Sequence, residues 1–366
     1  MGKIVILTSK TGGGHVSLAE ALRDRLADKH TIELIDPQPS IVHLHYRLVS
    51  RSALWLWATE FRLLDASQPA LLAHRLFTLF VMPTLVDLLQ RTQPDVLITT
   101  YPFLSYEVMQ TLQKIGSRTP LVMLFADPNG VHATWLTEKR AALTLAPSRE
   151  TYAQALSVGF DAQRLRLVGW PVRAQFYRAV CTAEQRAATL TRLGLSDATD
   201  RFTIFLQGGG EGAAQFGRTV ERVLEQGPQI QVILAAGTNQ TLYNRFHSAH
   251  RNLHVLPFTR EIAPFMAAAD VVMGKAGPNM LFEAVTLGKP FIATAYIPGQ
   301  EQANLEFIRR HRLGWVALTA EHQRRLLAKL IAQRGELHAM RAGVEAYRAW
   351  NQQNSEQIVP LIETLF

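Results

Sequence analysis

The residues best suited to chemistry stand at glycine-rich turns that directly follow apolar segments. The sequence SKTGGGHVSLAEALRDRL (9–26) follows the apolar run KIVIL and places His15 directly after three glycines. A second turn, QGGGEG (207–212), follows RFTIFL. A strand that ends in glycines and turns into a helix presents backbone N–H groups and the helix dipole to an anion. Glycine permits the close approach and the positive φ that such a turn requires.

The histidine adds acid–base chemistry to the first turn. Leu18, Leu22 and Leu26 recur at a spacing of four and predict a helix, with Ser17 and Glu20 as a possible capping box. His15 would then project from the helix start toward the edge where open α/β sheets bind ligands. An imidazole with an ordinary pKa of about 6.5 takes up a proton near neutral pH. The alternative is a structural histidine that hydrogen-bonds the backbone.

The third stretch, DVVMGKAGPNMLFEAVTLGKPFIATAYIPGQEQANLEF (270–307), holds the densest set of polar candidates. Pro278 suits the first position of a helix, and Glu283 about one turn later could bind a ribose diol while turn amides hold phosphate. The turn at 298–301 could bind sugar hydroxyls. Ordinary helix capping is the alternative. It accounts for Pro278, but not for the grouping of five residues at consecutive strand ends: Gly277, Glu283, Gln300, Glu301 and Asn304.

Short apolar segments alternate with helical patterns along the whole chain. A length of 366 residues is enough for about two domains. The alternation predicts an α/β protein with two Rossmann-like domains, each built on a parallel sheet, joined between 171 and 200. The last thirty or so residues read as helical. The predicted strands are 3–7, 31–36, 95–100, 121–127, 142–148 and 166–172, then 201–207, 231–237, 253–258, 270–277 and 290–296.

Composition narrows the class of protein. The sequence is 48% hydrophobic and 19% charged, which excludes a disordered chain. A net charge of +8 favours anionic partners, but nucleic acid is not expected because the sequence has no Lys/Arg run and no zinc-finger spacing. Cys181 is the one cysteine, which fits a reducing compartment. No signal peptide is expected, and no spanning helix, since no window of about 18 residues is free of charge.

Residues 40–82 differ from the rest of the chain. Leucine, tryptophan and phenylalanine alternate there with Arg47, Arg51, Arg62 and Arg75. Such a helix suits a membrane interface, where the apolar face enters the bilayer and the cations meet anionic headgroups. The alternative is a helical hairpin packed on its own domain, with Trp55 and Trp57 in the core.

The GGGH turn, the GGGEG turn and KAGPNMLFEA…GKPFI…YIPGQEQAN together resemble the GT-B glycosyltransferases that add sugar to diacylglycerol. These are the monogalactosyldiacylglycerol synthases and processive glucosyltransferases, which are similar to the N-acetylglucosamine transferase of the lipid-linked peptidoglycan precursor. The resemblance implies a GT-B fold, with two Rossmann-like domains facing a cleft. It implies an acceptor- and membrane-binding domain at 1–175, a UDP-sugar domain at 176–345 and a helix at 346–366 that returns to the first domain.

The resemblance also implies a role for each matching residue. His15, the implied catalytic residue, falls where the family has its candidate base or acceptor-site histidine. The implied acceptor-site residues are Gly13, Gly14, Asp127, His132 and Trp135, the last three within DPNGVHATWL. The implied donor residues are Gly209, Gly210, Glu211, Lys275, Ala276 and Gly277 near the phosphates, Phe258 and Thr259 at the uracil, Glu283 at the ribose, and Gln300 and Glu301 at the hexose. The plant enzymes have an aspartate where this chain has Lys10. If that aspartate orients or charges the histidine, its absence here affects the assignment of His15 as the base.

The function implied is inverting transfer of glucose or galactose from a UDP-hexose to diacylglycerol or a related lipid. The enzyme would sit peripherally, as a monotopic protein, on the cytoplasmic side of an anionic membrane. No cofactor and no required metal are expected, since the sequence has no Asp-x-Asp. Four alternatives stay open: a UDP-sugar 2-epimerase, a transferase with another lipid-linked acceptor, a binding protein, and an NAD-dependent dehydrogenase that uses the glycine turns with Asp36.

Overall fold

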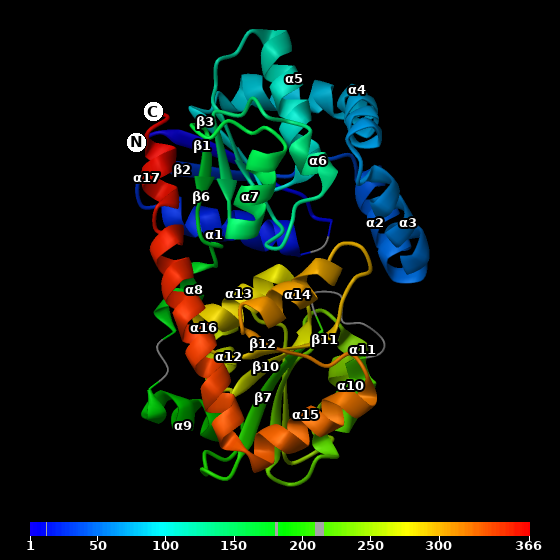
Figure 1. Cartoon of the computed structure of the whole chain (residues 1–366), viewed down its shortest axis with the longest axis vertical. Helices are drawn as coiled ribbons and strands as arrows, with labels where there is room; N and C mark the ends of the chain where they lie inside the picture. Colours follow the sequence, from blue (N-terminus) through cyan, green and yellow to red (C-terminus); the bar gives the residue numbers. More distant parts are fainter. Residues whose placement is uncertain (12, 180–181, 209–215) are drawn as a thin grey trace. The chain divides into compact units, whose positions relative to one another are not determined.

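The computed structural model describes the chain except residues 12, 180–181 and 209–215 (Figure 1). Two compact units divide it: unit 1 is Met1–Ala174, Ile297–Ala303 and Trp350–Phe366, and unit 2 is Gln175–Tyr296 and Asn304–Ala349. The predicted pair of α/β domains is confirmed. Several residues singled out from the sequence lie outside the described residues: Gly12, Cys181, Gly209, Gly210 and Glu211. The side chains of Arg47 and Arg51 also fall outside the description.

Unit 1 is built on a sheet of six parallel strands in the order β2-β1-β3-β4-β5-β6. The four residues from Ile4 to Leu7 are fully buried, as expected for a strand covered on both faces. Strand order reverses between β1 and β3, so the loops after these two strands flank the switch point where such sheets bind ligands. The strands are β1 Lys3–Leu7, β2 Thr31–Ile35, β3 Val96–Thr99, β4 Leu121–Leu124, β5 Leu143–Ala146 and β6 Leu165–Leu167.

The first helix starts earlier than a capping box allows. Gly13 is the residue before α1, and its carbonyl already accepts a helical hydrogen bond from the Ser17 N–H at 3.0 Å. Ser17 therefore lies inside the helix, and the predicted capping box with Glu20 is wrong. The remaining helices of unit 1 before the domain boundary are α2 Ser40–Ser52, α3 Leu54–Leu64, α4 Ser67–Thr92, η1 Pro102–Leu104, α5 Ser105–Ile115, α6 Ala133–Leu136 and α7 Arg149–Ser157, following α1 Gly14–Leu26.

Helices α2, α3 and α4 form one long connection between β2 and β3 (Figure 1). Trp55 on α3 is 73% exposed, so the interpretation of a hairpin with this tryptophan in the core is wrong. Within the described residues, α4 is long and apolar enough to cross a membrane by length and composition, which the sequence analysis did not expect. Its inner face nevertheless packs on unit 1, since Val81, Leu85 and Leu88 join the core around β1, β3 and β4.

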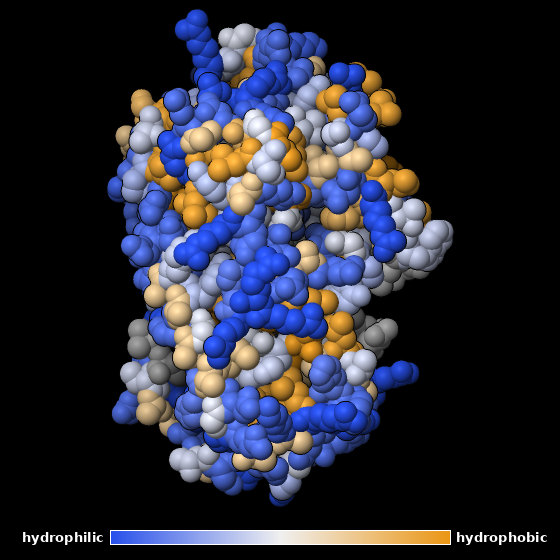
Figure 2. Space-filling model, in the orientation of Figure 1, coloured by the Kyte–Doolittle hydropathy of each residue, from blue (hydrophilic) through white to orange (hydrophobic). Residues whose placement is uncertain are grey.

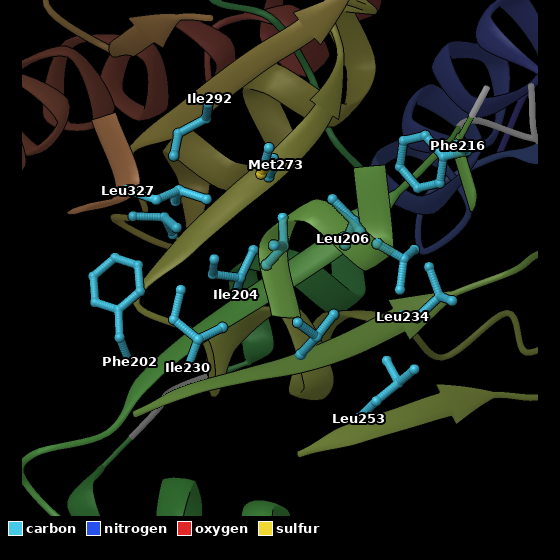
Figure 3. Packing of buried hydrophobic residues seen from close by; sticks show 14 of the residues in the cluster. Phe202, Ile204, Leu206, Phe216, Ile230, Leu234, Leu253, Met273, Ile292 and Leu327 are labelled. Atoms are coloured by element: carbon cyan, nitrogen blue, oxygen red, sulfur yellow. The ribbon is translucent and has the colours of Figure 1, made fainter. Parts of the chain in front are cut away.

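Unit 2 repeats the parallel design, in the order β12-β11-β10-β7-β8-β9. The side chains of Ile204, Met273 and Ile292 project from neighbouring strands into one apolar layer with Leu327 (Figure 3). Here the switch point lies between β7 and β10. The strands are β7 Phe202–Gln207, β8 Ile230–Ala235, β9 Leu253–Leu256, β10 Val271–Lys275, β11 Phe291–Ala295 and β12 Gly314–Val316, the last of which was not predicted.

Glycine and proline mark the helix starts of unit 2. Gly277 precedes α13 and Pro278 occupies the first turn, as predicted. The other helices that begin in this part of the chain are α8 Ala174–Arg178, α9 Ala183–Arg192, α10 Phe216–Leu224, α11 Gln240–Phe246, α12 Ala263–Ala267, α14 Gln302–Arg310, α15 Ala320–Ala332 and α16 Arg334–Ser355, with α13 at Pro278–Thr286.

The end of the chain belongs to unit 1 from Trp350 onward. The Trp170 N–H donates to Asn351 Oδ1 at 2.7 Å, and Asn351 Nδ2 donates to the Trp170 carbonyl at 3.0 Å. Gly169 is required beside this pair because a Cβ there would lie 2.1 Å from the Asn351 carbonyl oxygen. The final helix, α17 (Ile358–Glu363), brings Phe366 against His30, so both termini lie in unit 1 (Figure 1).

Candidate active site

His15 bridges the switch point of the unit 1 sheet. Its Nδ1 lies 2.6 Å from the Thr100 carbonyl oxygen, and because a carbonyl only accepts, Nδ1 carries the proton. Thr100 follows β3, whereas His15 lies at the start of α1 after β1, so the bond joins the two connections that flank the switch. Nε2, which has no recorded partner among the described residues, is left with a lone pair. Burial lowers the pKa of His15 to about 4, since the Thr100 carbonyl only partly offsets the desolvation.

The loop after β1 is held by a polar network. Ser9 Oγ donates to Gln38 Oε1 at 2.6 Å and lies 2.7 Å from Thr11 Oγ1. The Tyr101 hydroxyl bonds Gln38 and Thr11, and its ring meets the His15 ring edge-on at 4.9 Å. Burial raises the pKa of Tyr101, so its hydroxyl stays neutral. The sequence analysis named neither Thr100 nor Tyr101; their place directly after a predicted strand was the available signal.

Asp36 also serves this loop. Its Oδ2 accepts from the Lys10 N–H at 2.8 Å, and its Oδ1 accepts from the Gln38 N–H at 3.1 Å. His43 Nε2 lies 3.2 Å from Oδ2. The acid that a dinucleotide-binding interpretation requires is therefore already bonded to loop amides. Lys10 contributes its backbone, and its side chain is exposed.

The segment after β4 carries the predicted acceptor-site group. His132 caps α6: its Nδ1 accepts from the Thr134 N–H at 3.3 Å and its Nε2 donates to the Phe61 carbonyl at 2.8 Å. Burial lowers the pKa of His132, and both ring nitrogens are engaged. Trp135 is 1% exposed beside Phe125 in the core. The structure thus brings His132 and Trp135 together with Asp127, and of the three residues only Asp127 is half-buried rather than buried.

Asp127 has an unusual electrostatic setting. Burial, together with the negative charges of Glu301 and Asp65, raises its pKa to about 7 against the opposing effect of a hydrogen bond from the Trp135 side chain. Glu301 lies in Ile297–Ala303, which is part of unit 1. That segment is tied down by Asn129 Nδ2, which donates to the Ala303 carbonyl at 2.9 Å. Glu301 is 5% exposed, and its Oε2 accepts from the Ile297 N–H at 2.8 Å.

The predicted donor residues follow the carboxyl ends of neighbouring strands of unit 2. After β10, the Ala276 N–H donates to the Ala295 carbonyl at 2.8 Å and the Gly277 N–H donates to the Lys275 carbonyl at 2.7 Å. Both of these amides are therefore already bonded to backbone carbonyls. Glu283 lies further along the same helix and is 6% exposed.

Two further donor candidates present groups suited to a ligand. Phe258, after β9, is 64% exposed and offers a planar face to a nucleobase. Beside it, Thr259 Oγ1 accepts from the Glu261 N–H at 3.1 Å. Gln300 Oε1 is a buried acceptor without a recorded partner in the described part of the chain. Among those same residues, no three His, Cys, Asp or Glu side chains are grouped to hold a metal ion.

Comparisons with known proteins agree with this division. The family model for monogalactosyldiacylglycerol (MGDG) synthase matches residues 15–172, and that for the glycosyltransferase family 28 C-terminal domain matches residues 203–342. The probable MGDG synthase 2 of Oryza sativa subsp. japonica is 28% identical over 83% of this chain and 68% of its own length. MGDG synthase 1 of Arabidopsis thaliana is 26% identical over 84% of this chain and 60% of its own length.

Solved structures show the same fold at low identity. Acinetobacter baumannii MurG superposes with a TM-score of 0.63 at 16% identity over the whole of both chains. Anabaena HepE, in complex with UDP and glucose, gives a TM-score of 0.61 at 14% identity, again over both whole chains. The chain is therefore a glycosyltransferase with a GT-B fold, in which a region matching the MGDG synthase family model precedes one matching the glycosyltransferase family 28 C-terminal domain.

Proposed function

We propose that the enzyme transfers a hexose, glucose or galactose, from a UDP-hexose to the free hydroxyl of diacylglycerol or a related membrane lipid, with inversion at the anomeric carbon. The observation that carries the proposal is the position of His15, with Nε2 unprotonated at the switch point of the MGDG synthase domain. Relatives named as MGDG synthases support a lipid acceptor, and the complex of HepE with UDP and glucose supports the donor class.

In this mechanism the acceptor hydroxyl hydrogen-bonds to His15 Nε2. As the hydroxyl oxygen forms its bond to the anomeric carbon, the bond from that carbon to the diphosphate oxygen breaks, and UDP leaves with the electron pair. Nε2 accepts the hydroxyl proton as the nucleophile attacks. Positioned proton transfer of this kind contributes typically 10²–10⁴-fold to a rate.

The donor half stabilises the charge that develops on UDP. The first turn of α13 offers amides and the positive end of a helix dipole, and Lys275 adds a cation at the end of β10. We assign Glu283 to the ribose, Phe258 to the uracil and Gln300 to a hexose hydroxyl. We also assign Gly209, Gly210 and Glu211 to the diphosphate. These groups supply the charge stabilisation by themselves, so we propose that no metal is required.

The acceptor half also carries a surface suited to a bilayer, which we propose binds the cytoplasmic face of an anionic membrane. Figure 2 shows apolar side chains over α4. Arg62 and Arg75 are exposed among them and suit anionic headgroups. Because α4 packs its other face on unit 1, we propose interfacial binding rather than a span. The exposed apolar residues of this surface are Ile41, Leu44, Leu48, Trp55, Leu63, Leu72, Leu76, Leu79 and Phe80.

The test is product formation by purified protein. Radiolabelled UDP-glucose or UDP-galactose is mixed with vesicles that contain diacylglycerol, and the lipid extract is separated by thin-layer chromatography. The proposal predicts a labelled glycolipid with one of the donors, and a loss of about 10²-fold or more in His15→Gln. Turnover of UDP-N-acetylglucosamine without any lipid would instead establish the epimerase. No labelled lipid with either donor would refute the transferase with this acceptor.

A further inference from the structure

His15 alone is a poor final holder of the acceptor proton. Its Nδ1–H bonds a neutral carbonyl, at Thr100, rather than a carboxylate that would stabilise an imidazolium. With a pKa of about 4, the ring is protonated in roughly one molecule in a thousand at pH 7. The proton that leaves the hydroxyl must therefore pass to a stronger base near the same edge of the sheet.

Most titratable groups near that edge are already committed. Asp36 is bonded by two loop amides, and both nitrogens of His132 are engaged. Glu107 is fully buried against His74 at 2.8 Å and lies out of reach of a substrate. Asp65 accepts from the Ala133 N–H at 3.0 Å and has a side chain that is 53% exposed, which favours an ordinary surface carboxylate.

Asp127 differs from each of these groups. It follows β4, and β3 alone separates β4 from β1, so the strands that carry Asp127 and His15 are about 10 Å apart. As a residue it is half-buried, and in the described part of the chain no Lys, Arg or His is recorded as its ion-pair partner. The groups that face it are Trp135 of α6, which donates a hydrogen bond, and the carboxylates of Glu301 and Asp65.

We propose that Asp127 is a second proton acceptor of the acceptor half and sets the pH dependence of transfer, an inference that rests on the proposed function. The hydroxyl hydrogen-bonds to His15 Nε2 as its oxygen attacks the anomeric carbon. The O–H bond breaks as Nε2 takes the proton, and a water then relays a proton from Nε2 to the Asp127 carboxylate, which leaves His15 neutral again. The bond from the anomeric carbon to the diphosphate breaks, and UDP carries away the electron pair.

The first test is the pH profile of kcat/KM for glycolipid formation. Wild type should show a rate that rises with pH to a midpoint near 7, because the carboxylate is the active form. Asp127→Asn keeps an acceptor for the Trp135 hydrogen bond. Its kcat/KM should be at least 10²-fold lower than that of wild type and should no longer rise with pH around 7. Glu301→Gln should move the midpoint to lower pH, since removal of a neighbouring negative charge lowers the pKa of Asp127. Asp65→Asn should move it in the same direction by less.

His15→Gln is the matched comparison. Its kcat/KM should be lower than that of wild type at every pH but should still rise with pH to a midpoint near 7. A structural role for Asp127 would lower the rate without moving any midpoint. If Asp127→Asn is as active as wild type with the same limb, the inference is overturned while the proposed function stands. If wild type makes no glycolipid from either nucleotide sugar, the proposed function itself fails.

A second measurement needs no substrate. Carbon-13 labelling of aspartate carboxyls should reveal one resonance, absent in Asp127→Asn, that titrates near pH 7 and shifts to lower pH in Glu301→Gln. A resonance for Asp127 that titrates near pH 4 would overturn the inference. Unchanged thermal unfolding of Asp127→Asn would confirm that its rate loss does not come from misfolding.

Discussion

Replacing two exposed apolar residues of α4 should release the enzyme from membranes. Leu79 and Phe80 are 72% and 70% exposed, so most of each side chain is available to a bilayer. Full burial of such a side chain is worth about 1.5–3 kcal/mol, and seven-tenths of it roughly 1–2 kcal/mol. Leu79→Ser with Phe80→Ser should therefore weaken partition by about 2–4 kcal/mol, which is roughly 30- to 900-fold.

Flotation with phosphatidylglycerol-containing vesicles measures this partition directly. The matched control is Ile115→Ser with Leu156→Ser, on α5 and α7, where the side chains are 37% and 38% exposed and lie off the proposed surface. The control should bind vesicles as wild type does, and thermal unfolding should show that both pairs remain folded at the assay temperature. Equal vesicle binding by wild type and the α4 pair would refute the reasoning that this helix face contacts the membrane.

Three further outcomes are expected. Glu283→Gln should weaken UDP binding about tenfold or more in calorimetry without changing vesicle binding, because it removes a carboxylate assigned to the ribose; unchanged affinity would contradict that assignment. Burial raises the pKa of Glu107 to about 7. Between the unfolded pKa of about 4.5 and pH 7 the folded state therefore binds a proton that the unfolded state has lost. The free energy of unfolding should fall as the pH rises through this range, by up to ~3 kcal/mol. Chemical denaturation of Glu107→Gln should show a flatter pH dependence, and an identical slope would contradict this origin. Glycolipid formation should survive dialysis against EDTA, whereas a loss restored by Mg²⁺ or Mn²⁺ would overturn the metal-independent proposal.

Features determined by neighbouring residues were open to prediction. Short apolar runs bounded by Gly, Pro and Asp indicated eleven strands close to their observed positions, because a strand covered on both faces needs little besides apolar side chains. Pro278 at the start of α13 follows from its lack of an N–H. The three-residue strand β12, Gly314–Val316, was missed because so short a run carries little signal.

Features that depend on residues far apart in the sequence could not be predicted. The protonation of His15 depends on the Thr100 carbonyl, 85 residues away. The occupied amides of Ala276 and Gly277 depend partly on the Ala295 carbonyl of the next strand. Glu301 follows a strand of unit 2 yet belongs to unit 1, where its charge acts on Asp127. No local pattern encodes such contacts, so sequence can nominate these residues but not their charge states.

The central claim is that the hexose of a UDP-sugar becomes bonded to the hydroxyl of a diacylglycerol. The most direct measurement uses carbon-14 in the hexose and tritium in the diacylglycerol, with UDP release followed in parallel. We expect both labels in one chromatographic product, with one hexose per diacylglycerol after the first transfer and one UDP released for each sugar transferred. His15→Gln should form far less of this product. UDP released without tritiated product, or carbon-14 confined to free sugar, would contradict the account.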